Sequence, residues 1–199
     1  MNALPTILML LACAIFLWAF WIYNKGVIFG HHTPAFTGWA LFSIITFVNF
    51  RTYLDWTGEW INIVVFFTDF FICSATTLMI LIRLKGKVRV DRGDIQIASV
   101  SLFAIVLWVI FQKAQIGNLI NLVAYSLAFV PIYRNVLKDP RNEPTKPWAT
   151  WAFAFLINIV VLKIQSVTTI MDYVSPIVYF IHHAAIGVLS LRKSKEMRV

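Results

Sequence analysis

The sequence predicts an all-α membrane protein with seven transmembrane helices, and three observations lead to this fold class. Of 199 residues, 60% are hydrophobic and only 13% are charged, a composition too apolar for a soluble domain of this size. Seven apolar stretches are each long enough to cross about 30 Å of hydrocarbon. The polar loops between them are alternately rich and poor in Lys and Arg. We therefore expect most of the chain to lie in a bilayer.

Each predicted helix is an apolar run bounded by charged or helix-breaking residues. In order, the runs cover residues 4–23, 37–53, 61–83, 95–112, 117–135, 148–166 and 171–191. The first has no basic segment before it and is long enough to span, so we interpret it as a helix and not as a cleaved signal peptide. The separating loops are residues 26–34, 51–59, 83–94, 113–117, 139–147 and, weakly marked, 163–172.

The charges on the loops predict the orientation. Counting by side, fourteen of the 17 Lys and Arg residues fall in one compartment, and only Arg51, Lys113 and Lys163 fall in the other. By the positive-inside rule the N-terminus is then outside and the C-terminus cytoplasmic. Topology and anionic headgroups also account for the net charge of +8, so we do not expect nucleic acid as a partner.

An internal repeat relates the two halves of the chain. Ile22-Tyr23 leads through a loop to Thr33-Pro34 and to a helix start containing Trp39, and Ile132-Tyr133 leads similarly to Lys146-Pro147 and Trp151. Two three-helix units have the same orientation only if one further helix separates them. The sequence thus predicts parallel 3+1+3 repeats: residues 1–92, a linker helix in residues 93–114, and residues 115–199 with the cytoplasmic tail.

The segment Pro131-Ile132-Tyr133-Arg134-Asn135, its charged loop and the following Pro147-Trp148 resemble the SWEET/PQ-loop superfamily, most closely its uncharacterised bacterial seven-helix branch. Ile132 stands where the Pro-Gln pair would have its glutamine. The resemblance implies a seven-helix transporter that works by rocking of one repeat against the other around a central site.

Polar residues at bilayer depth are the candidate binding residues, because burying them without partners is costly. Asp69 is near the middle of its helix, on one face with Asn62, Cys73 and Thr76. The repeat offset of 112 to 113 places Asp69 opposite Ile181 or His182, so we expect Asp69 and His182 to form a proton-sensitive pair; structural hydrogen bonding is the alternative. The remaining candidate binding residues are Asn121, Asn158, Tyr179 and His183.

Other features supply candidate gating residues and exclude some chemistry. Pro131, Trp39 and Trp151 are candidate gating or hinge residues, and interfacial anchoring is the alternative for the tryptophans. His31 and His32 are too isolated to suggest a metal site. Nucleophile, zinc-protease and phosphate-loop motifs are absent from the sequence, so no cofactor is expected and an enzyme is the less favoured class.

The sequence as a whole favours a transporter or facilitator of a small polar solute in the inner (plasma) membrane, with multiple spans. The alternatives are an intramembrane enzyme acting on a lipid-like substrate and a receptor or structural subunit. The expected partners are membrane lipids and an unidentified solute, and a homo-oligomer is left open.

Overall fold

The computed structural model describes residues 3–57, 60–88, 90–111, 114–165 and 170–192, and this part of the chain is helical without strands. The elements, in order, are α1 (Ala3–Phe29), α2 (Phe36–Thr57), α3 (Trp60–Arg83), α4 (Arg92–Phe111), α5 (Ala114–Lys138), the short 3-10 helix η1 (Pro140–Asn142), α6 (Thr145–Gln165) and α7 (Ile170–Ser190). The predicted all-helical class is therefore confirmed, and each predicted span overlaps one long helix.

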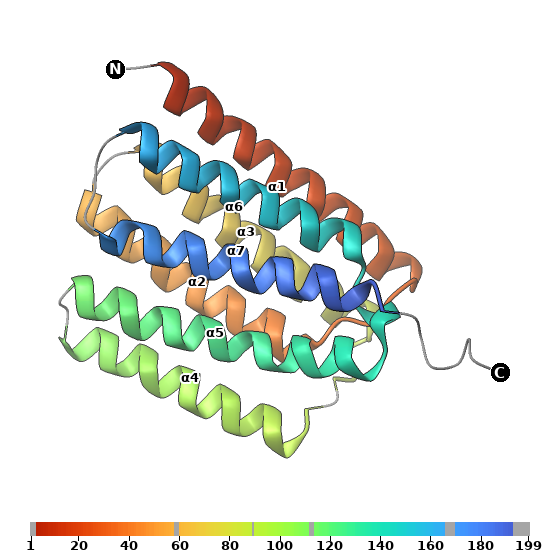
Figure 1. Cartoon of the computed structure of the whole chain (residues 1–199). Helices are drawn as coiled ribbons and strands as arrows, with labels where there is room; N and C mark the ends of the chain where they lie inside the picture. Colours follow the sequence, from red (N-terminus) through yellow and green to blue (C-terminus); the bar gives the residue numbers. More distant parts are fainter. Residues whose placement is uncertain (1–2, 58–59, 89, 112–113, 166–169, 193–199) are drawn as a thin grey trace.

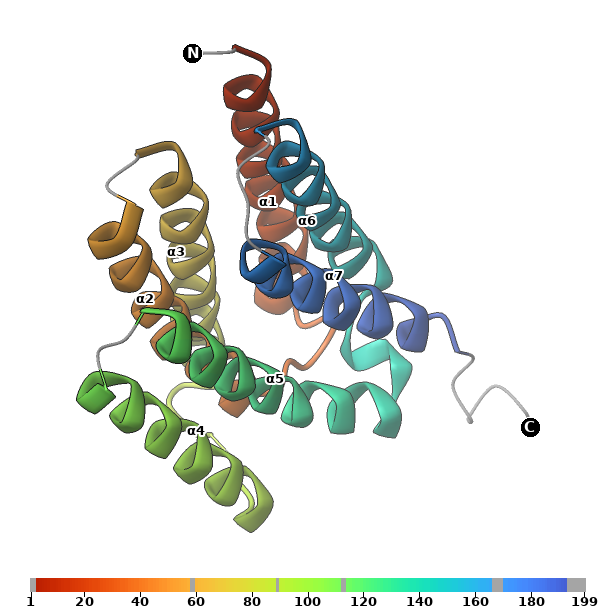
Figure 2. The ribbon, with the colours of Figure 1, turned by 60° about the vertical axis from the view of Figure 1, so that its left-hand side comes forward.

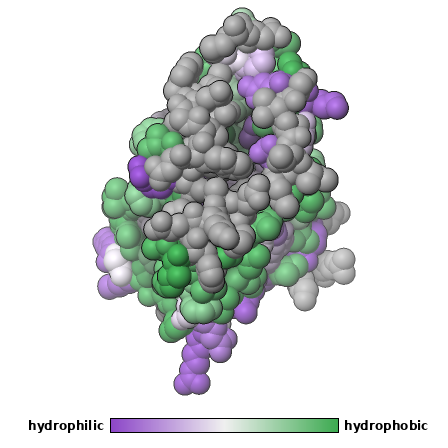
Figure 3. All heavy atoms as spheres, turned by 90° about the vertical axis from the view of Figure 1, so that its left-hand side faces the viewer, coloured by the Kyte–Doolittle hydropathy of each residue, from purple (hydrophilic) through white to green (hydrophobic). Residues whose placement is uncertain are grey.

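Five helical segments of the described chain are long and apolar enough to cross a membrane. They are residues Ala3–Phe29, Val64–Arg83, Leu119–Lys138, Thr145–Gln165 and Asp172–Ser190. Large hydrophobic side chains are exposed on the outside of the bundle, for example Trp21 on α1, Phe103 on α4 and Val188 on α7. Figure 3 shows green hydrophobic residues over the lower part of the face that it draws, beside purple hydrophilic ones. These features indicate a membrane protein.

The first helix is longer than predicted, because Gly26 belongs to the helix and not to the loop. A Cβ atom on Gly26 would overlap Cε1 of the His32 ring, so glycine lets the loop fold back onto α1 at this point without a shift of that ring. The helix ends instead at Gly30, whose φ of 72° is left-handed, and His31 N–H donates to the Gly26 carbonyl at 2.9 Å. This is the glycine-dependent C-terminal cap common in helices.

Helix packing interlocks the first and last three long helices. Within these sets, α3 packs against α1 and α2, and α7 packs against α5 and α6. Between them, α1 packs against α6 and α2 packs against α5. Helix α4 lies at the edge, against α5 and to a lesser extent α2 (Figures 1 and 2). Six helices therefore enclose the interior, and α4 is peripheral.

The crossing of α2 and α5 requires a residue without a side chain. A Cβ atom on Gly38 would lie 2.8 Å from Cγ1 of Ile132 and 3.0 Å from the carbonyl oxygen of Ala128. Real Cβ atoms do not approach neighbours so closely, so glycine sets the separation of these two helices. Gly38 is one residue before Trp39, and the close approach fixes the depth of that indole in the bundle.

The buried centre of the bundle holds an aromatic cluster formed by Tyr23, Trp39, Trp148 and Trp151. The ring centroids of Tyr23 and Trp39 are 5.0 Å apart, and those of Trp148 and Trp151 are 5.2 Å apart. Trp39 in α2 and Trp151 in α6 are 5.8 Å apart. Aromatic pairs at such distances stabilise by about 0.5–1.5 kcal/mol beyond their area burial. The cluster therefore joins α1, α2 and α6.

Candidate functional site

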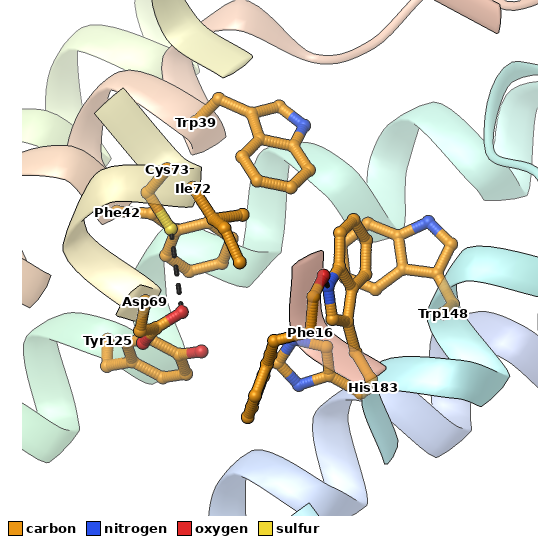
Figure 4. A pocket seen from close by; sticks show the side chains of 10 residues that line it. Phe16, Trp39, Phe42, Asp69, Ile72, Cys73, Tyr125, Trp148 and His183 are labelled. Atoms are coloured by element: carbon orange, nitrogen blue, oxygen red, sulfur yellow. Dashed lines mark hydrogen bonds between the residues drawn. The ribbon is translucent and has the colours of Figure 1, made fainter. Parts of the chain in front are cut away.

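A small central cavity lies at the junction of the six interlocked helices. Every long helix except α4 contributes to its walls, which are Phe16, Trp39, Phe42, Asp69, Ile72, Cys73, Tyr125, Trp148, Trp151 and His183. Figure 4 shows Asp69, Cys73 and Tyr125 on one side and His183 with Trp148 on the other. The space open to the centre of a water-sized sphere is about 10 Å³, which is room for about one water molecule.

Asp69 provides the one carboxylate in this wall. Its residue is 7% exposed, and its Oδ1 accepts a hydrogen bond from the Cys73 thiol at 3.8 Å, one helical turn away on α3. A thiol is a weak donor, so this bond offsets little of the cost of burying a carboxylate. A carboxylate at the centre of a membrane helix costs about 2.5 kcal/mol or more. Asp69 therefore lies in the cavity wall with a weak hydrogen-bond donor beside it.

The histidine that shares this cavity is His183, and not the predicted His182. The Nδ1 of His182 is 2.9 Å from the Tyr133 hydroxyl, and its Nε2 is 3.1 Å from the Ser126 hydroxyl. Both ring nitrogens thus face α5, and the ring stacks on Phe129 at 4.4 Å. Successive helical residues are rotated by about 100°, which is why the neighbouring His183 points into the cavity instead. The expected direct pairing of Asp69 with His182 is corrected accordingly.

A second polar cluster joins α2, α5 and α7. The Asn49 side-chain amide donates to the Tyr179 hydroxyl at 2.6 Å, and the Asn121 amide donates to Oδ1 of Asn49. All three residues are buried. The ring of Tyr179 lies 4.0 Å from that of Tyr125, which lines the cavity. Two predicted residues, Asn121 and Tyr179, therefore meet beside the cavity through Asn49, which the sequence analysis did not select.

The other predicted residues lie in several places. Trp39 and Trp151 are cavity walls, and Asn158 is buried in α6 at 8% exposure. Pro131 lies inside α5 and lines a separate pocket at the end of the bundle. Asn62 belongs to α3, but its side chain is outside the described part of the structure.

A fully buried carboxylate that was not predicted from the sequence, that of Glu143, lies between η1 and α6. Its Oε2 accepts hydrogen bonds from the Tyr23 hydroxyl at 2.9 Å and from Nε1 of Trp148 at 3.0 Å, and its Oε1 accepts one from Asn135 at 3.1 Å. Trp39 Nε1 in turn donates to the Tyr23 hydroxyl at 3.0 Å. Glu143 therefore fixes two cavity walls, Trp39 through Tyr23 and Trp148 directly.

The environment of Glu143 also shifts its proton affinity. Burial raises the pKa of its carboxyl from an ordinary 4.5 to about 7, although the four donors from Tyr23, Asn135, Trp148 and the Ala35 backbone act to lower it. His32, whose ring is 4.7 Å from that of Tyr23, has its pKa lowered to about 4 by burial and by the charge of His31. Of these two groups, the carboxyl of Glu143 thus has the pKa nearer to neutral pH.

A larger pocket, here called the vestibule, opens at the end of the bundle near Glu143. It has a volume of about 440 Å³, and its walls are Thr33, Pro34, Ala35, Phe36, Leu84, Lys87, Val88, Asp91, Asp94, Pro131, Arg134, Asn135 and Lys138. Asn135 belongs to its wall and also donates to Glu143. A chain of hydrogen bonds therefore runs from the vestibule, through Asn135 and Glu143, to the indoles of the central cavity.

Within the described residues no group of three or more His, Cys, Asp and Glu side chains has a metal-binding arrangement. Cys13 and Cys73 are buried free thiols. What the geometry offers is a buried carboxylate and an imidazole in an aromatic cavity, with a hydrogen-bonded barrier between that cavity and a wider pocket.

Comparisons with known proteins give no relative from which to transfer a function. The sequence matches no family model and no curated protein, and the fold matches no solved structure.

Proposed function

We propose that this protein is a transporter or facilitator of a small polar solute that works by alternating access around the central cavity. The observation that carries the proposal is the pair Asp69 and His183 in the wall of one buried cavity to which six helices contribute. Ionisable side chains inside a membrane bundle mark substrate or ion pathways and face the bundle interior. The cavity has room for about one water molecule, so the structure corresponds to a state closed around its site.

The pattern of helix contacts supports two parallel repeats. Let α1, α2 and α3 correspond to α5, α6 and α7 in that order. The contact of α1 with α6 then corresponds to that of α5 with α2, and the contacts of α3 with α1 and α2 correspond to those of α7 with α5 and α6. The cavity walls follow the same exchange only in part, since α1 and α5 contribute one residue each and α2 and α6 two each, whereas α3 contributes three and α7 one. Rocking of one repeat against the other would then open the cavity to alternate sides.

The orientation belongs to the same proposal. The ends of α1, α3 and α5 lie at one end of the bundle in Figure 1; in the sequence, Lys25 is in the last part of α1, and basic residues follow α3 and α5 closely. Seven spans, with the N-terminus outside and the C-terminus cytoplasmic in the inner (plasma) membrane, would make the vestibule the cytoplasmic opening. A cysteine placed at position 87 should then resist membrane-impermeant thiol reagents on whole cells, whereas one at position 2 should react. The reverse labelling would overturn the orientation.

Transport is tested with purified protein in liposomes. Proteoliposomes are loaded with a mixture of small polar solutes, and the efflux of each solute is followed by mass spectrometry. We expect at least one solute to leave faster than from empty liposomes, and Asp69→Asn to slow that efflux. Lack of any protein-dependent efflux would overturn the proposal. Conversion of a lipid-like compound by the protein in detergent, without a gradient, would favour the intramembrane enzyme.

A further inference from the structure

The chemistry of the central cavity distinguishes between classes of solute. Six of its ten wall residues are aromatic: Phe16, Trp39, Phe42, Tyr125, Trp148 and Trp151. The faces of aromatic rings carry partial negative charge and attract cations, with tryptophan the strongest. The wall contains one acidic residue, Asp69, and neither lysine nor arginine. Both kinds of wall group therefore favour a positively charged occupant.

His183 adds an acceptor to this wall. Its Nδ1 is 2.7 Å from the carbonyl oxygen of Tyr179, a separation at which Nδ1 must carry the proton and donate it. In the neutral ring the other nitrogen, Nε2, is then a hydrogen-bond acceptor. The imidazole thus offers a lone pair, as the Asp69 carboxylate does. Because an occupant must supply what the wall lacks, it should bring donor hydrogens or positive charge.

These features exclude several other solutes. An anion would face a buried carboxylate and no basic wall residue. A metal cation such as Na⁺ or Ca²⁺ would require several oxygen ligands, and the wall offers few oxygens besides those of Asp69 and the Tyr125 hydroxyl. An organic ammonium ion fits both halves of the wall, because its charge pairs with the carboxylate and its alkyl groups pack on the rings. Aromatic cages recognise such ions in other proteins.

We propose, building on the proposed transport function, that the solute is a small organic ammonium cation bound by Asp69 and the surrounding aromatic rings. The present cavity is too small for it, so the cation enters as the indoles move apart. Trp39 is held through Tyr23, and Trp148 is held directly by Glu143. Release of these bonds opens the cavity toward the vestibule, whose volume of about 440 Å³ accommodates an ion of this class.

Binding is tested on the full chain in detergent with charged and neutral probes of one shape. Choline and tetramethylammonium are compared with 3,3-dimethylbutan-1-ol, the uncharged isostere of choline, at constant ionic strength. A ligand that binds only the folded state raises the melting temperature, and the chain's 8 tryptophans report unfolding by fluorescence. We expect both cations, but not the alcohol, to raise it. Equal effects of choline and the alcohol, or none from either cation, would overturn the proposal.

A matched pair of variants assigns the charge to one residue. Asp69→Asn keeps the shape of the side chain and removes its charge, and should weaken choline binding by about tenfold or more. Asp139→Asn makes the same change in the partly exposed carboxylate that pairs with Arg141, and should bind choline as the wild type does. Undiminished binding by Asp69→Asn would overturn the proposal. If that variant does not fold, the comparison of choline with its isostere in the wild type decides.

The same probes separate this inference from the transport function. Choline binding, with no protein-dependent efflux of choline or of any other solute from proteoliposomes, would leave the cation site standing and overturn transport. Protein-dependent efflux of a neutral or anionic solute, with no cation binding, would leave transport standing and overturn the cation site.

Discussion

Replacing Glu143 with glutamine should remove a pH dependence of stability that the wild-type protein carries. Burial raises the pKa of this carboxyl to about 7 from an ordinary 4.5. In the unfolded chain this carboxyl has its ordinary pKa of 4.5. The raised pKa of the folded protein therefore adds its full stabilisation below about pH 4.5, and this stabilisation is lost as the pH rises through about 7. The difference of about 2.5 pKa units corresponds to about 3 kcal/mol of unfolding free energy.

His32 acts in the opposite direction, so the two effects must be separated. Its pKa is lowered to about 4, which means that it contributes stability above its ordinary value of 6.5 and loses it as the pH falls. The wild-type profile alone would mix both contributions. Glu143→Gln keeps His32 and the length of the side chain, so the difference between the two proteins at each pH isolates Glu143.

The assay is fluorescence-monitored thermal unfolding of both proteins in one detergent, at pH values from about 5 to about 8. We expect the wild type to lose stability relative to the variant across this range. A constant difference between the two melting temperatures would refute the reasoning, because it would mean that Glu143 titrates alike in the folded and unfolded chain.

Two further pairs of variants test the packing and the second polar cluster by the same unfolding assay. Gly38→Ala should lower the unfolding free energy by about 1–2 kcal/mol because its Cβ atom would meet α5. Gly187→Ala, whose Cβ atom would have its nearest neighbour 3.5 Å away, should raise the unfolding free energy by about 0.5–1 kcal/mol. Equal effects of the two substitutions would contradict the packing argument. Tyr179→Phe removes the acceptor of the buried Asn49 amide and should lower the unfolding free energy by about 1–3 kcal/mol. Tyr133→Phe removes a hydroxyl beside the half-buried His182 and should lower the unfolding free energy by roughly 1 kcal/mol or less. A larger cost for Tyr133→Phe would show that the second cluster is not a main source of stability.

The long helices could be predicted because their signal is local. An apolar run of about 20 residues between charged loops is legible in the sequence, and each such run is a helix in the structure. The end of α1 was the clearest error, because Gly26 suggests a loop unless the later contact with His32 is known. That contact depends on the folded path of the chain, which no local pattern specifies.

Glu143 could not be predicted because its partners are remote. It belongs to a segment of Asp, Arg, Asn and Pro residues that is typical of a solvated loop, yet its side chain is fully buried. Only Trp148, five positions later, is a local hint. Tyr23 is 120 positions away, and nothing in either segment indicates that they meet.

The histidine was misassigned for a different reason. Matching the repeats gives an offset with an error of one or two residues, because the loops differ in length. In a helix one residue corresponds to about 100° of rotation, which decides whether a side chain faces the cavity or a neighbouring helix. The offset of the proposed repeats therefore pointed to residues one or two positions before His183, and the choice between His182 and His183 needed the structure.

The interlocking of the two helix sets has a consequence for how this protein is made. Tyr23 and Asn49 are in the first three helices, which leave the ribosome first. Glu143, the partner of Tyr23, is synthesised 120 residues later, and Tyr179, the partner of Asn49, is synthesised 130 residues later. Asn24 differs, because its partner Thr76 arrives within the same set. Until the second half is synthesised, Tyr23 and Asn49 lack the later partners that they have in the folded protein. Pairing of these polar side chains in the first half therefore depends on synthesis of the second half.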